Sequence, residues 1–346
     1  MENHDGLDEL VQRLRALEEK NREMRAWQSS VLSTLGELAD LMGSLEDRVN
    51  ATVLTSRINQ QRMESLRYEL QDPDYVSPVF KPHFLSMEET RRQIIEEGRS
   101  IARFGDGEFS AIRGIQRWNF QKEDPALGQK LKEVLQSNDP GFLVGLNENF
   151  YGDLSHLSEA AADGVRSYMT PETRKFHASL LDPERVYASA MICFIGKEQD
   201  VTDLRRFWND RDCVFIEGEY TRMGVGNDLF DNCRSISRIL CPAENAFDRY
   251  DEIMTAATKQ PKDRLMLLAL GPTATAMAYD LYREGYQALD VGHVDLLYEK
   301  FRAGYNSLTK VTIPYKYCNC DESGTGRQIE DIDDPEYRSQ IVAKIS

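Results

Sequence analysis

The chain has 346 residues, of which 41% are hydrophobic and 29% charged, and its formal net charge at pH 7 is -16. So acidic a chain repels nucleic acid and anionic membranes unless a local basic patch intervenes, and the sequence has none. No apolar run is long enough to cross a bilayer, and the acidic start MENHDGLDEL does not resemble a signal peptide. We therefore expect a cytoplasmic protein with no nucleic-acid partner and no transmembrane segment.

Residues 1–71 carry an apolar seven-residue repeat, which predicts a coiled coil that makes the chain an oligomer. Polar Asn21 and Gln28 interrupt the first seam position; one such residue favours a parallel dimer, and two leave the oligomer number open. The alternative is a long amphipathic helix lying on the rest of the chain. The first seam position holds Leu7, Leu14, Asn21, Gln28, Leu35, Met42 and Val49, and the second holds Leu10, Leu17, Met24, Val31, Leu38, Leu45 and Thr52.

Residues 72–84 include three prolines, which stiffen the chain and cannot continue a helix, so we expect a linker there. A second domain then covers residues 85–346. Ser86 is expected to cap its first helix, with Glu89 at the capping-box position.

From about residue 99, short apolar runs alternate with helical stretches. This order predicts an α/β fold: a Rossmann-like, mostly parallel sheet with helices on both faces, in which ligands bind at the carboxyl ends of the strands. A final helix is expected around 337–345. The predicted strands are SIARFG, GFLVGL, RVYASAMICFI, CVFIEG, SISRIL, RLMLLAL, QALDVG and KVTIPY, and the main helices lie around 127–135, 244–258 and 274–284.

The segment RFGDGE, residues 103–108, follows the first of these strands directly. In an extended chain Asp106 and Glu108 would point the same way and form a site for Mg²⁺ or Mn²⁺, which would complete its shell with water and phosphate oxygens. The alternative is an acidic turn in which Asp106 only caps the following helix.

The segment LLALGPTATAMAYDLYREG predicts a buried strand, a turn at Gly271, and a helix capped by Thr273. The start of such a helix suits a phosphate group. The alternative is a turn between strand and helix with no ligand.

Two further segments place acids after predicted strands. ALDVGHVDLLYEK brings Asp290, Asp295 and Glu299 around His293, although a lone histidine is more often structural. FIEGEYTRMGVGNDLFDN contains Glu217 and Glu219, which could hold a metal, bind a ribose, or belong to a simple loop. Cys318-x-Cys320 lacks the second half of a zinc site, and the remaining cysteines, 193, 213, 233 and 241, are expected to be reduced.

Together these motifs resemble the GT-D glycosyltransferases, a family first defined as a domain of unknown function. The resemblance rests on RFGDGE, on GEYTRMGVGNDLFDN with SRILCPAENAFDRYDEI, on LALGPTATAMAYDL and on ALDVGHVDLLYEK, in that order over about residues 85–345. It covers the second domain and leaves the coiled coil outside.

The resemblance implies a metal-dependent transferase that moves a hexosyl group from a UDP-sugar donor to a glycan or glycoprotein acceptor. By carry-over Asp106 and Glu108 hold the Mn²⁺ or Mg²⁺, while His293 and Glu299 form the catalytic pair, with Glu299 as general base. The chemistry is expected to be inverting. The expected donor-binding residues are Arg103, Glu219, Arg222, Asn227, Gly271 and Thr273.

Two other functions remain open at this point. The chain could be a non-catalytic assembly protein whose α/β domain senses a sugar nucleotide. It could also be a metal-dependent phosphoesterase that uses the same carboxylates.

Overall fold

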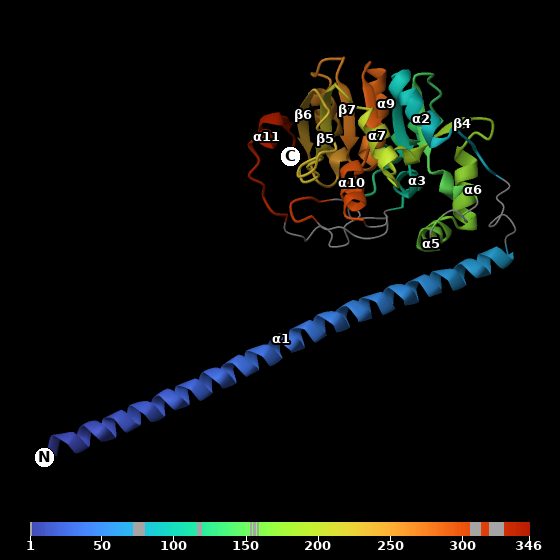
Figure 1. The fold of residues 1–346 in the computed structure, drawn as a ribbon. Coiled ribbons are helices and arrows are strands. Elements are labelled where there is room, and N and C mark those ends of the chain that lie inside the picture. The colour runs from blue at the N-terminus through green and yellow to red at the C-terminus, as the bar shows by residue number, and fades with distance from the viewer. Residues whose placement is uncertain are drawn as a thin grey trace. The chain divides into compact units, whose positions relative to one another are not determined.

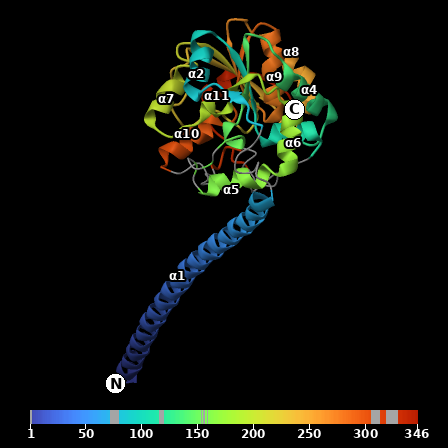
Figure 2. The ribbon, with the colours of Figure 1, turned by 90° about the vertical axis from the view of Figure 1, so that its right-hand side faces the viewer.

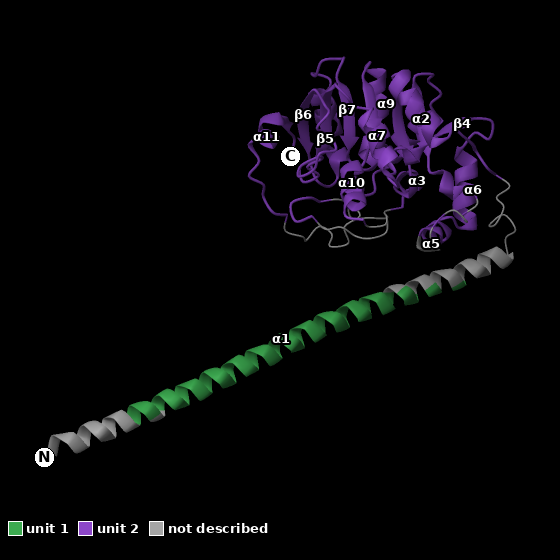
Figure 3. Cartoon of the chain, viewed as in Figure 1, with its two compact units in different colours: residues 1–64 green, residues 65–346 purple. Residues whose placement is uncertain are grey.

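The structure is a computed structural model that describes residues 2–71, 80–115, 120–152, 154, 157, 159–304, 313–317 and 329–346. It divides into two compact units, Met1–Glu64 and Ser65–Ser346 (Figure 3). Over the described residues, the structure has no helix that is both long and apolar enough to cross a membrane.

The first unit consists of most of one helix, α1, which runs from Glu2 to Gln71 and whose last seven residues belong to the second unit (Figure 1). The expected long N-terminal helix is thereby confirmed. Its predicted seam is exposed in the single chain, with 52% of Leu14, 57% of Leu35 and 49% of Leu45 accessible to solvent. Leu7 and Leu10 lie outside the side chains that the structure describes.

The second unit is a parallel sheet, and the predicted α/β class is confirmed. Its strand order is β1-β4-β3-β2-β8-β7-β5-β6-β9, and each pairing among the described residues is parallel. The strands are β1 (His83–Phe84), β2 (Ser100–Phe104), β3 (Phe142–Leu146), β4 (Val186–Ser189), β5 (Asp212–Gly218), β6 (Ser235–Cys241), β7 (Leu265–Ala269), β8 (Gln287–Asp290) and β9 (Ile341–Lys344).

Helices cover both faces of this sheet, as expected. Figure 2 shows α2, α7 and α10 on one side and α4, α8 and α9 on the other. The α-helices are α2 (Met87–Glu96), α3 (Asp106–Arg113), α4 (Pro125–Gln136), α5 (Glu159–Tyr168), α6 (Pro171–Leu180), α7 (Glu198–Arg205), α8 (Tyr250–Ala257), α9 (Pro272–Arg283), α10 (Val294–Arg302) and α11 (Pro335–Gln340). Short 3₁₀ turns are η2 (Glu148–Phe150), η3 (Ala190–Cys193) and η4 (Ala246–Arg249).

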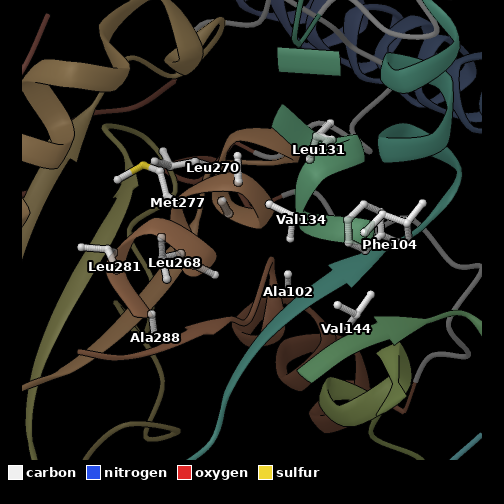
Figure 4. Packing of buried hydrophobic residues seen from close by; sticks show 14 of the residues in the cluster. Ala102, Phe104, Leu131, Val134, Val144, Leu268, Leu270, Met277, Leu281 and Ala288 are labelled. Carbon is white, nitrogen blue, oxygen red and sulfur yellow. The ribbon is translucent and has the colours of Figure 1, made fainter. Parts of the chain in front are cut away.

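Each strand sends alternate side chains to opposite faces, so the sheet supports two cores. On β2, Ala102 and Phe104 lie in one core with residues of α4 and α9 (Figure 4), whereas Ile101 lies in the other core with residues of α2, α7 and α10. Both layers are closed by fully buried aliphatic and aromatic side chains. The central strands therefore read as continuous apolar runs, which is typical of parallel sheets buried on both faces.

Several local expectations are tested by the structure. The hydroxyl of Ser86 accepts a hydrogen bond from the Glu89 amide at 3.0 Å, so the predicted cap is confirmed. The last helix is shorter than expected, because it stops at Gln340 and residues 341–344 form β9 beside β6. Of the predicted strand 310–315, residues 310–312 lie outside the described part, and 313–315 are not a strand.

The cysteines agree with the expectation of reduced thiols. Cys193, Cys213 and Cys241 are buried and free, and Cys233 is free and half-buried. Cys318 and Cys320 lie outside the described residues.

Candidate functional site

The connections leave β2 and β8 towards opposite faces of the sheet, which makes the boundary between these parallel strands a switch point. The helices that follow β2 pack on one face, whereas α10, which follows β8, packs on the other. In open α/β sheets, ligands bind outside the carboxyl ends of the strands at such a point. Each of the predicted site motifs follows β2, β5, β7 or β8.

Arg103 and Asp290 join the two strands that border this switch point. The guanidinium Nε of Arg103 donates to the carbonyl oxygen of Asp290 at 2.6 Å, and Nη2 donates to its carboxylate at 3.1 Å. The same carboxylate accepts a hydrogen bond from the Thr275 hydroxyl at 3.1 Å. Gly292 follows with a φ of 53°, and a Cβ there would lie 2.4 Å from Nη2 of Arg103. The backbone turn thus makes room for the arginine.

The two acids of RFGDGE do not lie on an extended chain. They occupy the first turn of α3, with Gly105 as its N-cap, and residues two apart on a helix do not face each other. Glu108 reaches back and accepts the Gly105 amide hydrogen bond at 2.8 Å, so the acid that caps this turn is Glu108 rather than Asp106. Both side chains nevertheless line the same cleft.

Glu108 is held in an environment that disfavours its charge. Burial, followed by the negative charges of Asp290 and Asp106, raises the pKa of Glu108 to about 7, although the Gly105 amide opposes the change. A positively charged ligand would relieve this cost. The described residues contain no cluster of three or more His, Cys, Asp or Glu side chains with metal-ligating geometry.

The helix start after β7 differs from the expectation in one detail. The N-cap of α9 is Gly271, with a φ of 57°, and no side chain caps it. Thr273 is therefore not the cap; it is buried inside the first turn, and its hydroxyl lies 3.4 Å from Oε1 of Gln121. The first turn of α9 faces the cleft through Gly271 and Pro272.

These elements enclose a cleft of about 360 Å³ at the carboxyl edge of the sheet. It brings together five predicted site residues: Arg103, Asp106, Glu108, Gly271 and His293. It also includes side chains that the sequence did not single out, namely Phe120, Gln121, Lys122, Asn147, Met191, Thr221 and Tyr317. Thr221 belongs to the GEYTRMGVGNDLFDN motif, and Met191 lies in η3, within a predicted strand. The others lie in loops outside the four motifs, where neither periodicity nor spacing indicates a site.

The loop after β5 is organised by internal contacts. Glu217 is completely buried; its carboxylate accepts hydrogen bonds from Arg238 Nη1 at 2.5 Å and from the Met223 amide at 2.7 Å. Glu219 pairs instead with Lys344 at 2.9 Å. The two acids therefore do not converge on one point, and neither lines the cleft.

Arg222 and Asn227 belong to the same loop and also lie away from the cleft wall. Nη1 of Arg222 donates to the carbonyls of Tyr315 and Glu330, at 2.9 and 2.7 Å. Nδ2 of Asn227 donates to Oε1 of Glu299 at 2.7 Å. These side chains tie the loop to segments that come later in the chain.

The predicted catalytic pair is divided between two surroundings. His293 is the N-cap of α10 and lines the cleft, whereas Glu299 points to Asn227 and is not part of the cleft wall. Asp295, between them, is completely buried and pairs with Lys316 at 2.7 Å. Of this motif, the cleft therefore contains His293 and the end of β8.

A second, larger cleft of about 820 Å³ lies at the opposite edge of the sheet. It is bordered by the first residues of β3 and β4, including Phe142 and Val186. It contains none of the predicted site residues and lies at the amino ends of the strands, where α/β sheets do not usually bind ligands. The smaller cleft is therefore the candidate functional site.

Comparison with known proteins places this geometry in context. The family model described as "Glycosyltransferase GT-D fold" matches residues 101–321. A solved structure described as "A New Glycosyltransferase (DUF1792) from Streptococcus sanguinis" is 35% identical, with a TM-score of 0.70, and the match covers 77% of this chain and 100% of that one. Another, described as "The highly conserved domain of unknown function 1792 has a distinct glycosyltransferase fold", is 32% identical over 79% of this chain and 99% of that one, with a TM-score of 0.72.

Two curated relatives are also similar. "Probable glycosyl transferase Gly" of Streptococcus gordonii is 36% identical over 274 residues, which are 76% of this chain and 39% of the relative. "Glycosyltransferase GlyD" of Streptococcus pneumoniae is 35% identical over 267 residues, which are 75% of this chain and 32% of the relative. The chain therefore spans only 39% and 32% of the length of these two relatives.

Proposed function

This chain belongs to the family of glycosyltransferases with the GT-D fold, and on that basis we propose that it moves a hexosyl group from a UDP-sugar to a glycan or glycoprotein acceptor. The observation that carries the proposal is the meeting of two helix starts, those of α3 and α9, with four acids, Asp106, Glu108, Glu123 and Asp290, in one cleft. Such a site offers N–H groups to a diphosphate and carboxylates to a cation.

A divalent cation fits the donor set of this cleft. Asp106 and Glu108 supply hard oxygen ligands, and Mg²⁺ usually takes one or two carboxylates and completes its shell with water and phosphate oxygens. The raised pKa of Glu108 also favours a nearby positive charge. When bound, Mn²⁺ or Mg²⁺ would neutralise the charge that develops on the leaving diphosphate.

We propose that the residues around Asp106 and Glu108 shape the cleft and position the donor, and that they take no part in the chemical step. Arg103 is occupied by Asp290, so we assign it to holding the switch point and not to a direct hydrogen bond with the donor. Gly271 brings the backbone of α9 close to the cleft, and His293 borders it from α10. Thr273, Glu219, Arg222 and Asn227 would act through the loops and helices that they fix.

For the transfer step we propose Glu299 as the base. The acceptor hydroxyl oxygen attacks the anomeric carbon, the bond from that carbon to the diphosphate oxygen breaks, and the hydroxyl proton passes to Glu299. Attack from the face opposite the leaving group inverts the anomeric centre. This role requires the acceptor to approach α10 from the side of Asn227, because the Glu299 carboxylate accepts a hydrogen bond from Asn227 on that side.

One experiment separates this function from its rivals. UDP-sugars are screened for thermal stabilisation with and without Mn²⁺, and a ligand at a hundred times its dissociation constant should add about 2.7 kcal/mol. The stabilising donor is then incubated with acceptor and the products are identified. Sugar on the acceptor supports the transferase, free phosphate a phosphoesterase, and binding without turnover an assembly protein.

We also propose that α1 associates with a second copy of this chain in parallel. In that arrangement the polar seam residues Asn21 and Gln28 meet their own copies, which fixes the register. Trp27 and Leu32 lie beside the seam with 67% and 69% of their surfaces exposed, and they widen its apolar face. An isolated helix gains little from such exposed apolar side chains, whereas a coiled coil buries them.

A further inference from the structure

Two aromatic rings stand together at one end of the cleft. The ring centroids of Phe120 and Tyr317 are 6.4 Å apart, and their planes are inclined by 36°. Both residues line the cleft, and both are only half-buried. Neither belongs to a motif used above, so the proposed transfer chemistry leaves them without a role.

Both aromatic residues are hydrogen-bonded to the turn at Glu244 and Asn245. The Phe120 carbonyl accepts a hydrogen bond from the Asn245 amide at 2.9 Å, and Asn245 itself has a φ of 53°. The Tyr317 amide donates to the Tyr220 carbonyl at 2.9 Å, and its hydroxyl donates to Oε1 of Glu244 at 3.1 Å. The backbone of Phe120 and both the backbone and the hydroxyl of Tyr317 are therefore anchored before any ligand binds, which lowers the entropic cost of stacking on the two rings.

Close contacts define an order of groups along the cleft. A Cβ on Gly271 would come within 2.7 Å of the Phe120 ring, so this ring lies directly against the start of α9. A Cβ on Gly107 would lie 4.0 Å from Pro272, so the start of α3 is next to the start of α9. The order is thus aromatic pair, α9 start, then the α3 turn with its acids.

We propose that Phe120 and Tyr317 form a stacking platform for the nucleobase of the donor. The inference rests on the proposed function, since a nucleotide sugar presents base, diphosphate and sugar in the same order as the groups along the cleft. Every base has a π face, so stacking supplies affinity and leaves the choice of base to polar contacts. The platform also sets the direction in which the donor lies.

The test measures two ligands on five proteins by calorimetry with Mg²⁺ present: UDP, which carries a base, and inorganic pyrophosphate, which does not. Phe120→Leu and Tyr317→Leu keep apolar bulk and remove the ring, whereas Phe120→Tyr and Tyr317→Phe keep the ring. We expect the leucine variants to bind UDP roughly 5- to 150-fold more weakly, the usual worth of base stacking, with pyrophosphate affinity unchanged. The two ring-preserving variants should bind UDP like the wild type.

Each contrary result has a distinct meaning. Wild-type affinity for UDP in both leucine variants would overturn the platform, as would equal losses for UDP and pyrophosphate, because the rings would then only shape the cleft. Loss in Tyr317→Phe equal to that in Tyr317→Leu would assign the effect to the hydroxyl and overturn the stacking role of Tyr317. A wild-type chain that binds no UDP at all would overturn the proposed function, and this inference with it.

Discussion

Arg103 holds Asp290 through both its backbone carbonyl and its carboxylate, at 2.6 and 3.1 Å, and so links β2 to β8 beside the cleft. Lysine cannot reproduce this forked contact, although it keeps the charge. We expect Arg103→Lys to lower the free energy of unfolding by about 1–3 kcal/mol and to weaken donor binding. Chemical denaturation and calorimetry measure the two effects. Arg249→Lys, at an exposed pair with Glu252, is the control; equal stability of both variants would contradict the role given to Arg103.

The second prediction concerns the cation. Asp106→Asn and Glu108→Gln should each abolish transfer and leave the fold intact, because each removes a charged oxygen and adds no bulk. The amide oxygen of a glutamine at 108 can still accept the Gly105 hydrogen bond. Activity is measured with Mn²⁺ and after treatment with EDTA.

The acids after β5 provide the matched controls for this prediction. Glu219→Gln should keep the cation dependence of transfer, since Glu219 pairs with the exposed Lys344 and does not line the cleft. Glu217→Gln should instead cost about 3–5 kcal/mol of stability, because it leaves Arg238 without its buried partner. Full activity in EDTA, or activity lost only on changing Glu219, would reject the assignment to Asp106 and Glu108.

The third prediction separates the two proposed catalytic residues. Glu299→Gln should lower turnover roughly 10²- to 10⁴-fold, the usual contribution of a general base, with little change in donor affinity. His293→Ala should mainly weaken donor binding, because His293 borders the cleft. Donor affinity by calorimetry and turnover at saturating acceptor give the required pair of numbers. If Glu299→Gln turns over like the wild type, Glu299 is not the base, and Asp295, which is completely buried and paired with Lys316, cannot replace it.

The fourth prediction follows from a buried histidine outside the cleft. His177 is completely buried, and its ring nitrogens lie 2.7 and 3.2 Å from the hydroxyls of Tyr151 and Tyr168. Burial, helped by the positive charge of Arg113, lowers the pKa of His177 to about 3. In the unfolded chain a histidine has a pKa of about 6.5. Below that pH the unfolded state binds a proton, whereas His177 in the folded state stays neutral down to about pH 3.

Stability should therefore be complete above pH 6.5 and fall as the pH drops towards 3, by about 1.4 kcal/mol per pH unit from this group alone. Urea unfolding at pH 7, 6 and 5 measures the slope. His177→Gln should reduce the slope in this window, whereas changing the exposed His83 to glutamine should not. Equal slopes in all three proteins would show that His177 is protonated without cost.

The fifth prediction concerns α1. Removing residues 1 to 75 should leave a folded α/β unit of lower oligomeric state, since a solved relative consists of this part alone. Light scattering of both forms at micromolar concentration gives the mass. A monomeric full-length chain would refute the coiled coil.

Much of the sheet could be predicted because its strands are buried on both faces and read as apolar runs. The same signal fails at the edges: β9 alternates half-buried and exposed residues, so its four residues were assigned to a helix. β1 has only two residues, His83 and Phe84, and lies in the stretch predicted as a linker. Neither strand is long enough to give a period of its own.

The sequence predicts the site residues that belong to a motif directly after a strand. It does not predict those brought together by contacts between residues far apart in the sequence. RFGDGE identifies two of the acids that line the cleft, Asp106 and Glu108, but an extended chain is not what they form, because α3 begins at Asp106. The cap of α9 was assigned to Thr273 because its hydroxyl suits the role, whereas Gly271 takes it through a positive φ. Phe120 and Tyr317 are almost two hundred positions apart in the sequence, and no local sequence pattern predicts a contact between residues so far apart.

β8 lies between the two halves of the sheet, β1-β4-β3-β2 on one side and β7-β5-β6-β9 on the other. Its pairing with β2 joins Ile101 to Leu289, residues made at very different times during synthesis. Until residue 290 has left the ribosome, Arg103 has no Asp290 to hold and the cleft lacks one wall. A nascent chain that carries RFGDGE, and even the start of α9, therefore lacks the complete cleft, so we expect no transfer from it before β8 is made.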